Sequence, residues 1–322
     1  MKAVVYERYG PPEVLRLDEV DRPRPGDDQV LIKVHAVSVN ASDWETMRGK
    51  PMYSRIGGPL RPRFRILGSD VAGRVEAVGK SVTKFAPGDE VFGDNLALMG
   101  GFAEYVCARE QAVAAKPAGL SFEQAAAIPQ AGVIALQGIR TKGRVRSGER
   151  VLVNGAGGGA GMFAVQLAKL AGAHVTGVDN AGKHDFMLSL GADDVIDYAR
   201  TDFTRTGERY DVVLDLAGHL GVVNYRRVLA PNGRYRYVGG SVPSLLQVLL
   251  FGPLLGRRAG KEIRLLVVRQ NPQDLLTVAE LCQAGTLVPV IDQRYSLDEV
   301  PQALQRLGEG RAKGKLVITS TE

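Results

Sequence analysis

The pattern of apolar and polar residues changes about a third of the way along the chain. Before residue 121, short β-branched runs such as 29–39 and 71–79 lie between Gly, Pro and Asp residues, which is typical of strands joined by turns. Their close spacing predicts a compact, barrel-like β domain. Beyond this point, apolar segments of strand length alternate with helical ones, as at 150–154 and 161–172. This alternation predicts βαβ units and a parallel sheet covered by helices.

Helical segments border this second region at both ends. Residues 121–139 have helical spacing, with Ser121 in the position of an N-cap. Two further helical segments, 272–285 and 297–310, and a final strand at 314–320 close the chain. No internal repeat is apparent, so a solenoid is not expected.

A glycine-rich loop follows the first strand of the alternating region, in the stretch "VLVNGAGGGAG". The loop consists of Gly155, Ala156, Gly157, Gly158, Gly159, Ala160 and Gly161. Glycines at a strand-to-helix corner let backbone N–H groups approach a pyrophosphate, and the N-terminus of the next helix favours an anion. The strand and helix on either side make a dinucleotide site the stronger interpretation, although an ordinary turn would also use glycine.

Asp179 ends the next predicted strand, close to the spacing at which a dinucleotide site places the acid that binds the adenosine ribose. A carboxylate there favours NAD and repels a 2′-phosphate. The alternative is a solvated aspartate in a turn. Four residues later, Lys183 has the length and charge to reach a phosphate, although most surface lysines are simply solvated.

Composition excludes several classes of protein. The 322 residues include two distant cysteines, so neither a disulfide scaffold nor a cysteine-rich zinc site is expected. The net charge of +6 comes from scattered Lys and Arg, and we expect no nucleic-acid partner. The N-terminus lacks the features of a secretory signal, and the apolar run 242–256 is too short to span a bilayer. We therefore expect a cytoplasmic protein.

Several phrases in order along the chain carry a family resemblance: "MKAVVYERYGPPEVL", "SVNASDWETMRG", "LGSDVAGRVEAVG", "LGADDVIDY" and "RAKGKLVI". From end to end the sequence resembles the medium-chain dehydrogenase/reductase superfamily and, within it, the zinc-independent quinone oxidoreductase branch. The resemblance implies an α/β protein with a GroES-like, β-rich catalytic domain, residues 1–121 and 270–322. It implies a Rossmann domain with a doubly wound parallel sheet at 122–269, an active site in the cleft between the two domains, and a homodimer.

The resemblance also allows a test for zinc. Zinc-dependent members of the superfamily have Cys where this sequence has Asn40, His where it has Ser69, and a second Cys near Ala131. Tetrahedral zinc requires thiolate, imidazole or carboxylate ligands. We therefore expect chemistry without a metal.

The acceptor follows from the absence of a Lewis acid. Polarising an isolated carbonyl is difficult without one, because negative charge develops on the oxygen. A quinone or an α,β-unsaturated carbonyl delocalises the incoming electron pair. Residues and resemblance together predict an NAD(P)H-dependent reductase of small quinones or conjugated carbonyls. A zinc-free alcohol dehydrogenase or enoyl reductase stays open, as does a nucleotide-dependent protein that binds RNA or a membrane surface.

The resemblance implies three residues in contact with substrate. Asn40 and Asp43 match the Asn-x-x-Asp-x-x-x-Arg pattern of the zinc-independent branch, which Arg48 completes. The Asn40 amide has donors for substrate or the nicotinamide carboxamide, whereas Asp43 equally fits a cap for a helix starting at Trp44. Tyr53 lies where the family often has an active-site tyrosine that donates to a developing oxyanion.

Further positions match the cofactor site of the family. Gly158 and Gly161 fit the fingerprint, Gln130 falls near the nicotinamide riboside, and Gly218 and Gly239 end strands that face the cofactor. Three further residues match positions that hold a 2′-phosphate in NADPH-dependent quinone reductases: Lys183, Tyr198 and Arg311. Because Asp179 opposes this set, the choice between NADP(H) and NAD(H) stays open.

The segment 242–258 allows three interpretations. It combines a long apolar run with Arg257 and Arg258 at its end. An amphipathic helix on a membrane surface has this composition, while the resemblance favours a lid or a subunit contact.

Overall fold

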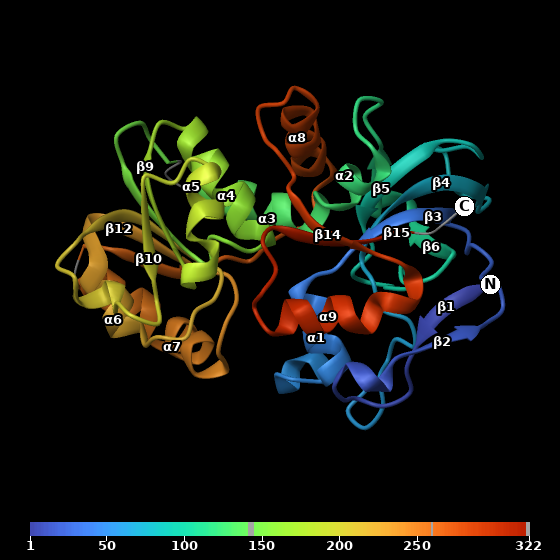
Figure 1. Cartoon of the computed structure of the whole chain (residues 1–322), viewed down its shortest axis with the longest axis horizontal. Helices are drawn as coiled ribbons and strands as arrows, with labels where there is room; N and C mark the ends of the chain where they lie inside the picture. The colour runs from blue at the N-terminus through green and yellow to red at the C-terminus, as the bar shows by residue number, and fades with distance from the viewer. Residues whose placement is uncertain (141–144, 259, 320–322) are drawn as a thin grey trace. The chain divides into compact units, whose positions relative to one another are not determined.

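The computed structural model describes residues 1–140, 145–258 and 260–319 (Figure 1). By the contacts among its residues, the chain divides into two compact units. Unit 1 comprises Met1–Gln130 and Gln270–Glu322, and unit 2 comprises Ala131–Arg269. The sequence placed the first boundary between residues 121 and 122, whereas the contacts change units nine residues later, inside a helix.

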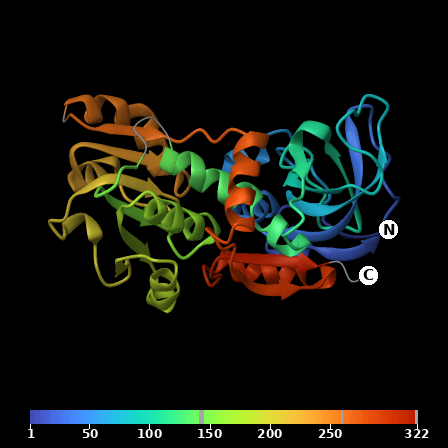
Figure 2. The same cartoon turned by 90° about the horizontal axis from the view of Figure 1, so that it is seen from above.

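Unit 1 is built around a mainly antiparallel sheet. Its strands are β1 (Lys2–Val5), β2 (Arg16–Glu19), β3 (Gln29–Ser38), β4 (Asp70–Val78), β5 (Glu90–Asp94), β6 (Tyr105–Arg109), β7 (Val113–Ala115), β14 (Ile291–Tyr295) and β15 (Lys315–Thr319). Seven of them form one sheet: six follow the order β14-β15-β3-β4-β5-β7, and β6 also pairs with β3, while β1 and β2 pair separately. Figure 2 shows the C-terminal strands beside the N-terminal ones, as the antiparallel pairing of β15 with β3 requires. The predicted β-rich domain is therefore present.

Unit 1 also contains helices, some of which begin at a residue whose side chain caps the helix. They are α1 (Ala41–Arg48), α2 (Phe122–Ala126), α8 (Pro272–Gln283) and α9 (Val300–Gly308), and unit 1 also holds the start of α3 (Pro129–Arg140). Ser121 caps α2 through a reciprocal pair of hydrogen bonds with Gln124. The single helical segment predicted at 121–139 is two helices, because Pro129 lacks an N–H and disfavours helical geometry in the residue before it.

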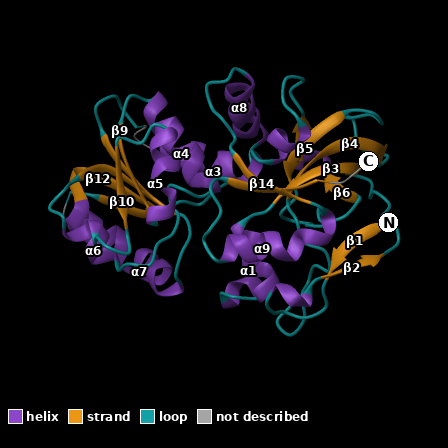
Figure 3. Ribbon diagram, viewed as in Figure 1, coloured by secondary structure: helices purple, strands orange, loops and turns teal. Residues whose placement is uncertain are grey.

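Unit 2 contains a six-stranded parallel sheet in the order β10-β9-β8-β11-β12-β13. Its strands are β8 (Arg150–Asn154), β9 (His174–Asp179), β10 (Asp194–Asp197), β11 (Tyr210–Asp215), β12 (Leu229–Tyr237) and β13 (Glu262–Leu265). Its helices are α4 (Gly159–Leu170), α5 (His184–Ser189), α6 (Val222–Val228) and α7 (Val242–Arg258), together with most of α3. Helices α4 and α5 pack on β8, β9 and β10, and α6 and α7 pack on β12 and β13 (Figure 3). The predicted doubly wound sheet is confirmed.

Each unit has its own apolar core. In unit 1 the core joins the sheet to α1 and α9 through residues such as Ile32, Met47 and Leu304. In unit 2 it joins β11 and β12 to α6 and α7 through Val213, Tyr235 and Val248. No helix among the described residues is both long and apolar enough to cross a membrane.

Candidate active site

The order of strands in unit 2 reverses between β8 and β11, which is where sheets of this kind typically bind a ligand. From β8 the chain proceeds to β9 and β10 on one side, and β11 to β13 lie on the other. At such a reversal, the loops at the carboxyl ends of the two central strands diverge and leave room for a ligand. Asn154 ends β8 and Asp215 ends β11, and Asn154 Nδ2 donates to Asp215 Oδ1 at 2.7 Å.

The glycine-rich loop starts at this point, directly after β8. Gly155 has a φ of +84°, a conformation that side-chain-bearing residues rarely adopt. The N–H groups of Gly155 and Ala156 both donate to Val178 O, at 2.9 and 3.1 Å, and so fix the loop to the end of β9. The loop is therefore rigidly attached to two strands of the sheet.

Gly161 and Gly158 serve different purposes in this loop. A Cβ on Gly161 would lie 2.6 Å from Ala156 Cα and would also clash with Gly155 O, so glycine there allows α4 to pack on its own loop. A Cβ on Gly158 would meet nothing closer than Gly155 O, at 3.4 Å. Gly158 is the N-cap of α4, and Gly159 and Ala160 form its partly exposed first turn. Because the first N–H groups of a helix have no acceptor within the helix, this open corner favours an anion.

Asp179 and Lys183 form a buried ion pair beside the same loop. Lys183 Nζ lies 3.2 Å from Asp179 Oδ1, and both side chains are less than a tenth exposed. Asp179 Oδ2 also accepts a hydrogen bond from Gly157 N at 3.0 Å. The carboxylate is thus a structural partner of the loop and not a solvated turn residue. Lys183 matches a position that binds phosphate in the family. Here it is paired with Asp179, whose negative charge disfavours a phosphate.

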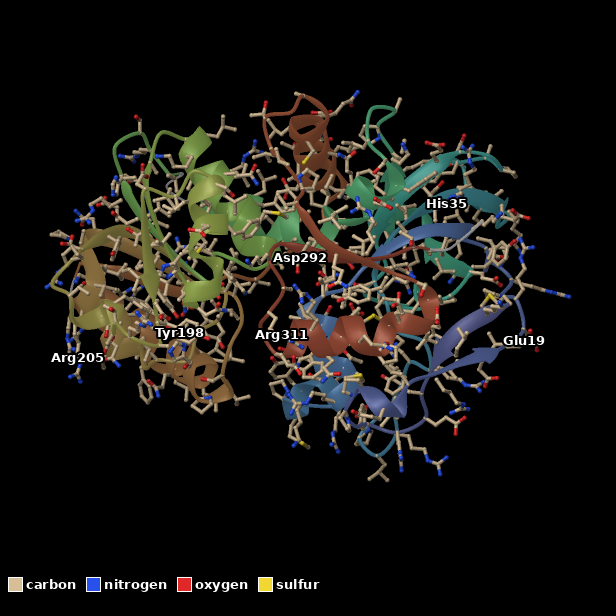
Figure 4. The ribbon with its side chains drawn as sticks, in the orientation of Figure 1. Glu19, His35, Tyr198, Arg205, Asp292 and Arg311 are labelled. Carbon is tan, nitrogen blue, oxygen red and sulfur yellow. The ribbon has the colours of Figure 1, made fainter. Side chains whose placement is uncertain are left out.

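The remaining predicted cofactor residues of unit 2 surround the same strand ends. Tyr198 is half exposed, donates its N–H to Asp179 O at 3.3 Å, and places its ring 6.3 Å from that of His219 (Figure 4). Gly218 N donates to Gly239 O at 2.8 Å, which ties the loops after β11 and β12 together. Arg311 belongs to unit 1, where it pairs with Glu309.

A polar cluster crosses the sheet of unit 1. Strand pairing aligns Ser38 with Asp70, and Asp70 with Asp94, in one row across β3, β4 and β5. Lys315 starts β15 on the other side of β3 and is buried. Its Nζ donates to Asn40 Oδ1 at 2.5 Å and lies 3.6 Å from Asp70 Oδ2. A buried cation therefore holds the side chain of a predicted substrate residue.

Gln130 joins the cluster from the first turn of α3. Its backbone N donates to both carboxylate oxygens of Asp70, at 3.2 Å each. Its Nε2 donates to Ser69 Oγ at 2.8 Å, and its Oε1 accepts from Ser42 Oγ at 3.2 Å. The structure thus connects Gln130 with Asn40 through Asp70 and Lys315.

Asp43 holds the start of α1. One carboxylate oxygen accepts from Asn40 N and the other from Gly68 N, both at 2.9 Å. Asn40 is the N-cap, and the helix begins at Ala41, three residues before the predicted Trp44. Asp43 is fully buried, and both of these hydrogen bonds come from backbone N–H groups. Its position is therefore that of a residue that stabilises the start of the helix.

Tyr53 is less constrained than the other predicted substrate residues. It lies on a single helical turn, Met52–Arg55, with 43% of its surface exposed. Its hydroxyl donates to Glu45 Oε2 at 3.3 Å. Partial burial and the nearby Glu45 carboxylate raise the pKa of Tyr53 to about 12, so the phenol remains a proton donor at neutral pH.

Burial governs the protonation of the acidic groups in the cluster. It raises the pKa of Asp43 to about 6, against the two backbone hydrogen bonds that favour the carboxylate. Burial also raises the pKa of Asp70 and lowers that of Lys315, while the attraction between the two charges opposes both shifts. Perturbed groups of this kind are concentrated at functional sites.

Comparison with known proteins gives the same assignment over the whole chain. The alcohol dehydrogenase GroES-like domain family matches residues 26–118, and the zinc-binding dehydrogenase family matches 190–318. A 2-methylene-furan-3-one reductase of Solanum lycopersicum is 37% identical over 332 residues, covering 99% of this chain and 79% of the relative. The mitochondrial NAD(P)H oxidoreductase RTN4IP1 of Bos taurus is 31% identical over 357 residues, covering 99% and 89%. The quinone oxidoreductase structure from Coxiella burnetii has a TM-score of 0.89 and 31% identity, covering 99% of each chain.

The chain belongs to the medium-chain dehydrogenase/reductase superfamily. Within it, the chain falls in the quinone oxidoreductase-like branch, as its sequence predicted, and is an oxidoreductase.

The zinc-ligand positions of the superfamily carry other side chains here. Asn40 binds Lys315, Ser69 binds Gln130, and Ala131 has only a methyl group. Among the described residues, no group of three or more His, Cys, Asp or Glu side chains is arranged to hold a metal ion. An amide whose oxygen accepts from an ammonium at the first position, and a neutral hydroxyl at the second, do not fit zinc.

Sequence reasoning missed Lys315, Asp70 and Asp94 as members of this site. Each lies at one end of an apolar strand, where a charge interrupts a run that otherwise predicts burial. That interruption is the signal available in the sequence, although it does not reveal which charges meet.

Proposed function

We propose that this protein reduces quinones or α,β-unsaturated carbonyl compounds with NADPH or NADH and without zinc. The corner between β8 and α4 carries the proposal. There Gly161 allows the helix to start close to the strand, and Gly158 leaves open space in front of the first helical N–H groups. These are the requirements of a dinucleotide pyrophosphate.

The residues around this corner fit a dinucleotide. The first-turn amides of α4 would hold the pyrophosphate, and Asp179 would accept from the ribose hydroxyls of NADH. Lys183 and the half-exposed Tyr198 would hold the 2′-phosphate of NADPH. Asp179 and Lys183 neutralise one another. The negative phosphates of either nucleotide therefore do not face an uncompensated carboxylate. We therefore expect both to bind.

When bound, a reduced nicotinamide supplies a hydride, and the acceptor takes up the electron pair on its conjugated oxygen and then a proton. The protein contributes to this step by orientation. Lysine is only a donor, so the oxygen of the Asn40 amide must face Lys315. The Asn40 Nδ2 then donates to Ser38 O at 3.5 Å, so Lys315 and Ser38 fix the amide in one orientation. The Tyr53 phenol, which stays protonated at neutral pH, is the predicted donor that would stabilise charge developing on the acceptor oxygen.

The names of the relatives support the same class of acceptor. A 2-methylene-furan-3-one carries an exocyclic double bond conjugated with a ketone, and its reductase is 37% identical to this chain. The structural relative at 31% identity is a quinone oxidoreductase. Both acceptors delocalise an added electron pair, so reduction does not depend on a Lewis acid.

The test is oxidation of NADPH and of NADH by a panel of quinones and enones, with zinc measured on the same sample. The proposal expects turnover with members of the panel and substoichiometric zinc. Failure of both nucleotides to bind, or one zinc ion per chain, would contradict it.

A further inference from the structure

Helix α7 of unit 2 presents a ridge of large apolar side chains to solvent. The exposed fractions are 50% for Leu246, 50% for Leu249, 67% for Leu250, 51% for Phe251 and 53% for Leu254. Their spacing of three and four residues places most of them on one side of the helix. Contiguous exposed apolar surface of this kind usually marks an interaction site.

The other side of α7 explains why the ridge faces outward. Ser244, Val248, Gly252 and Gly256 are buried and follow one another at intervals of four residues. A Cβ on Gly252 would lie 3.0 Å from Ile263 Cγ2, and one on Gly256 would lie 2.7 Å from Lys261 O. Small residues therefore let α7 lie directly on β13, and the large side chains are left on the outer side.

The surroundings of the ridge are basic. Between Asp215 and Glu262 the sequence has no Asp or Glu. The same stretch contains Arg226, Arg227, Arg234, Arg236, Arg257, Arg258 and Lys261. Arg234 and Arg236 pair with acidic groups of the sheet, Glu149 and Glu262.

Arg226, Arg227 and Arg257 belong to the two neighbouring helices α6 and α7. The first two belong to α6, which packs against α7 (Figure 3), and Arg227 and Arg257 are exposed. Asp202, which pairs with Arg205, also interacts with Arg227. The ridge is thus bordered by an excess of positive charge.

We propose that this face of unit 2 binds the surface of a membrane that contains anionic lipids. The α7 ridge would enter the boundary between headgroups and acyl chains, and the arginines would contact lipid phosphates. An apolar face edged by Arg or Lys is the pattern of interfacial helices. The inference goes beyond the proposed reaction and does not depend on it. A membrane surface is also where lipophilic quinones partition.

A second copy of the chain fits this face less well. In a symmetric dimer the same patch meets itself. The arginines of α6 and the end of α7 would then be gathered from both copies into one interface, and residues 216–261 supply no carboxylate to compensate them. An anionic lipid surface provides the missing negative charge.

Vesicle flotation tests the proposal. The purified full chain is mixed with vesicles of phosphatidylcholine alone or with added phosphatidylglycerol. We expect flotation with the anionic vesicles, weakened by salt. Leu250→Gln combined with Leu254→Gln should lower partitioning about tenfold or more, because two large side chains no longer enter the apolar region. Arg227→Gln combined with Arg257→Gln should lower partitioning to the anionic vesicles, because two positive charges no longer contact lipid phosphates.

A matched control uses exposed leucines of other helices in unit 2. Leu170 on α4 is 55% exposed and Leu188 on α5 is 45% exposed. Leu170→Gln with Leu188→Gln should float like the wild type, and circular dichroism should show that all variants are folded. The proposal is wrong if the wild type does not float with anionic vesicles, or if the α7 leucine variant floats equally well. It is also wrong if light scattering shows a dimer that the α7 variant converts to a monomer, since the ridge is then a subunit contact.

Discussion

Lys315 Nζ donates to Asn40 Oδ1 at 2.5 Å, although 275 residues separate the two in the sequence. Pairing of β15 with β3 brings them together. Asn40 starts α1, so the ammonium links the end of the chain to the region where we propose substrate contacts.

Replacing Lys315 by Met should destabilise the protein strongly. The variant leaves Asp70 buried without its cation, a change that typically costs about 3–5 kcal/mol. The free energy of unfolding in urea measures the loss. Lys313→Met is the control, because Lys313 lies two residues away and is exposed. A loss of less than about 1 kcal/mol for Lys315→Met would show that the ion pair contributes little.

Replacing Asp43 by Asn should reduce the dependence of stability on pH. The pKa of Asp43 in the folded chain is raised to about 6, above its ordinary 3.8, so the folded state binds this proton more tightly. The stabilisation is complete below 3.8 and is lost as the pH rises to about 6. Between pH 4 and 7, the free energy of unfolding of the wild type should therefore fall relative to that of Asp43→Asn. Parallel profiles would mean that Asp43 ionises normally. Exposed Asp21→Asn provides the control.

Asp43→Asn should also weaken one of the two backbone contacts at the start of α1. Its two oxygens accept from two different backbone N–H groups, and an amide has only one oxygen. One N–H would then face a donor, at a cost of about 1–3 kcal/mol. Hydrogen exchange at the Asn40 and Gly68 amides that is as slow in the variant as in the wild type would contradict these contacts.

Gly158→Val should lower nucleotide affinity severely and leave the fold intact. The backbone there is extended, with φ of −90°, and a Cβ has ordinary contacts, so the side chain would occupy the open space before α4. Fluorescence titration with NADPH measures affinity, and circular dichroism measures folding. Gly26→Val is the matched control, since a Cβ at Gly26 also has its nearest neighbour at 3.4 Å. Unchanged affinity in Gly158→Val would refute the assignment of the loop.

Asp179→Ser should shift preference toward NADPH. The substitution removes the charge that opposes a 2′-phosphate and releases Lys183 from its ion pair. Lys183→Met should shift preference in the opposite direction. The ratio of dissociation constants for NADPH and NADH measures both effects. An unchanged ratio in both variants would mean that the pair serves the loop alone.

The sequence predicted the parts of the fold that depend on local pattern. The glycine loop, the parallel sheet and the cap at Ser121 follow from neighbouring residues. β14 was missed because "IDQRY" has few apolar residues, and its pairing with β15 determines its structure. The break before Pro129 was missed although proline signals it.

The site of unit 1 was predictable only in part. Asn40, Asp43 and Gln130 came from a family resemblance. Their partners depend on strand register, which aligns Ser38, Asp70 and Asp94 across three strands. Likewise, the sequence suggested that Asp179 and Lys183 compete over a phosphate, and only the structure pairs them.

The most direct test of the account follows the hydride itself. NADPH or NADH carrying deuterium at the transferred position is mixed with an α,β-unsaturated ketone, on protein whose zinc content is known. The account predicts deuterium on the β-carbon of a saturated ketone, with substoichiometric zinc. Deuterium on the carbonyl carbon of an alcohol, or a rate that requires zinc, would contradict it.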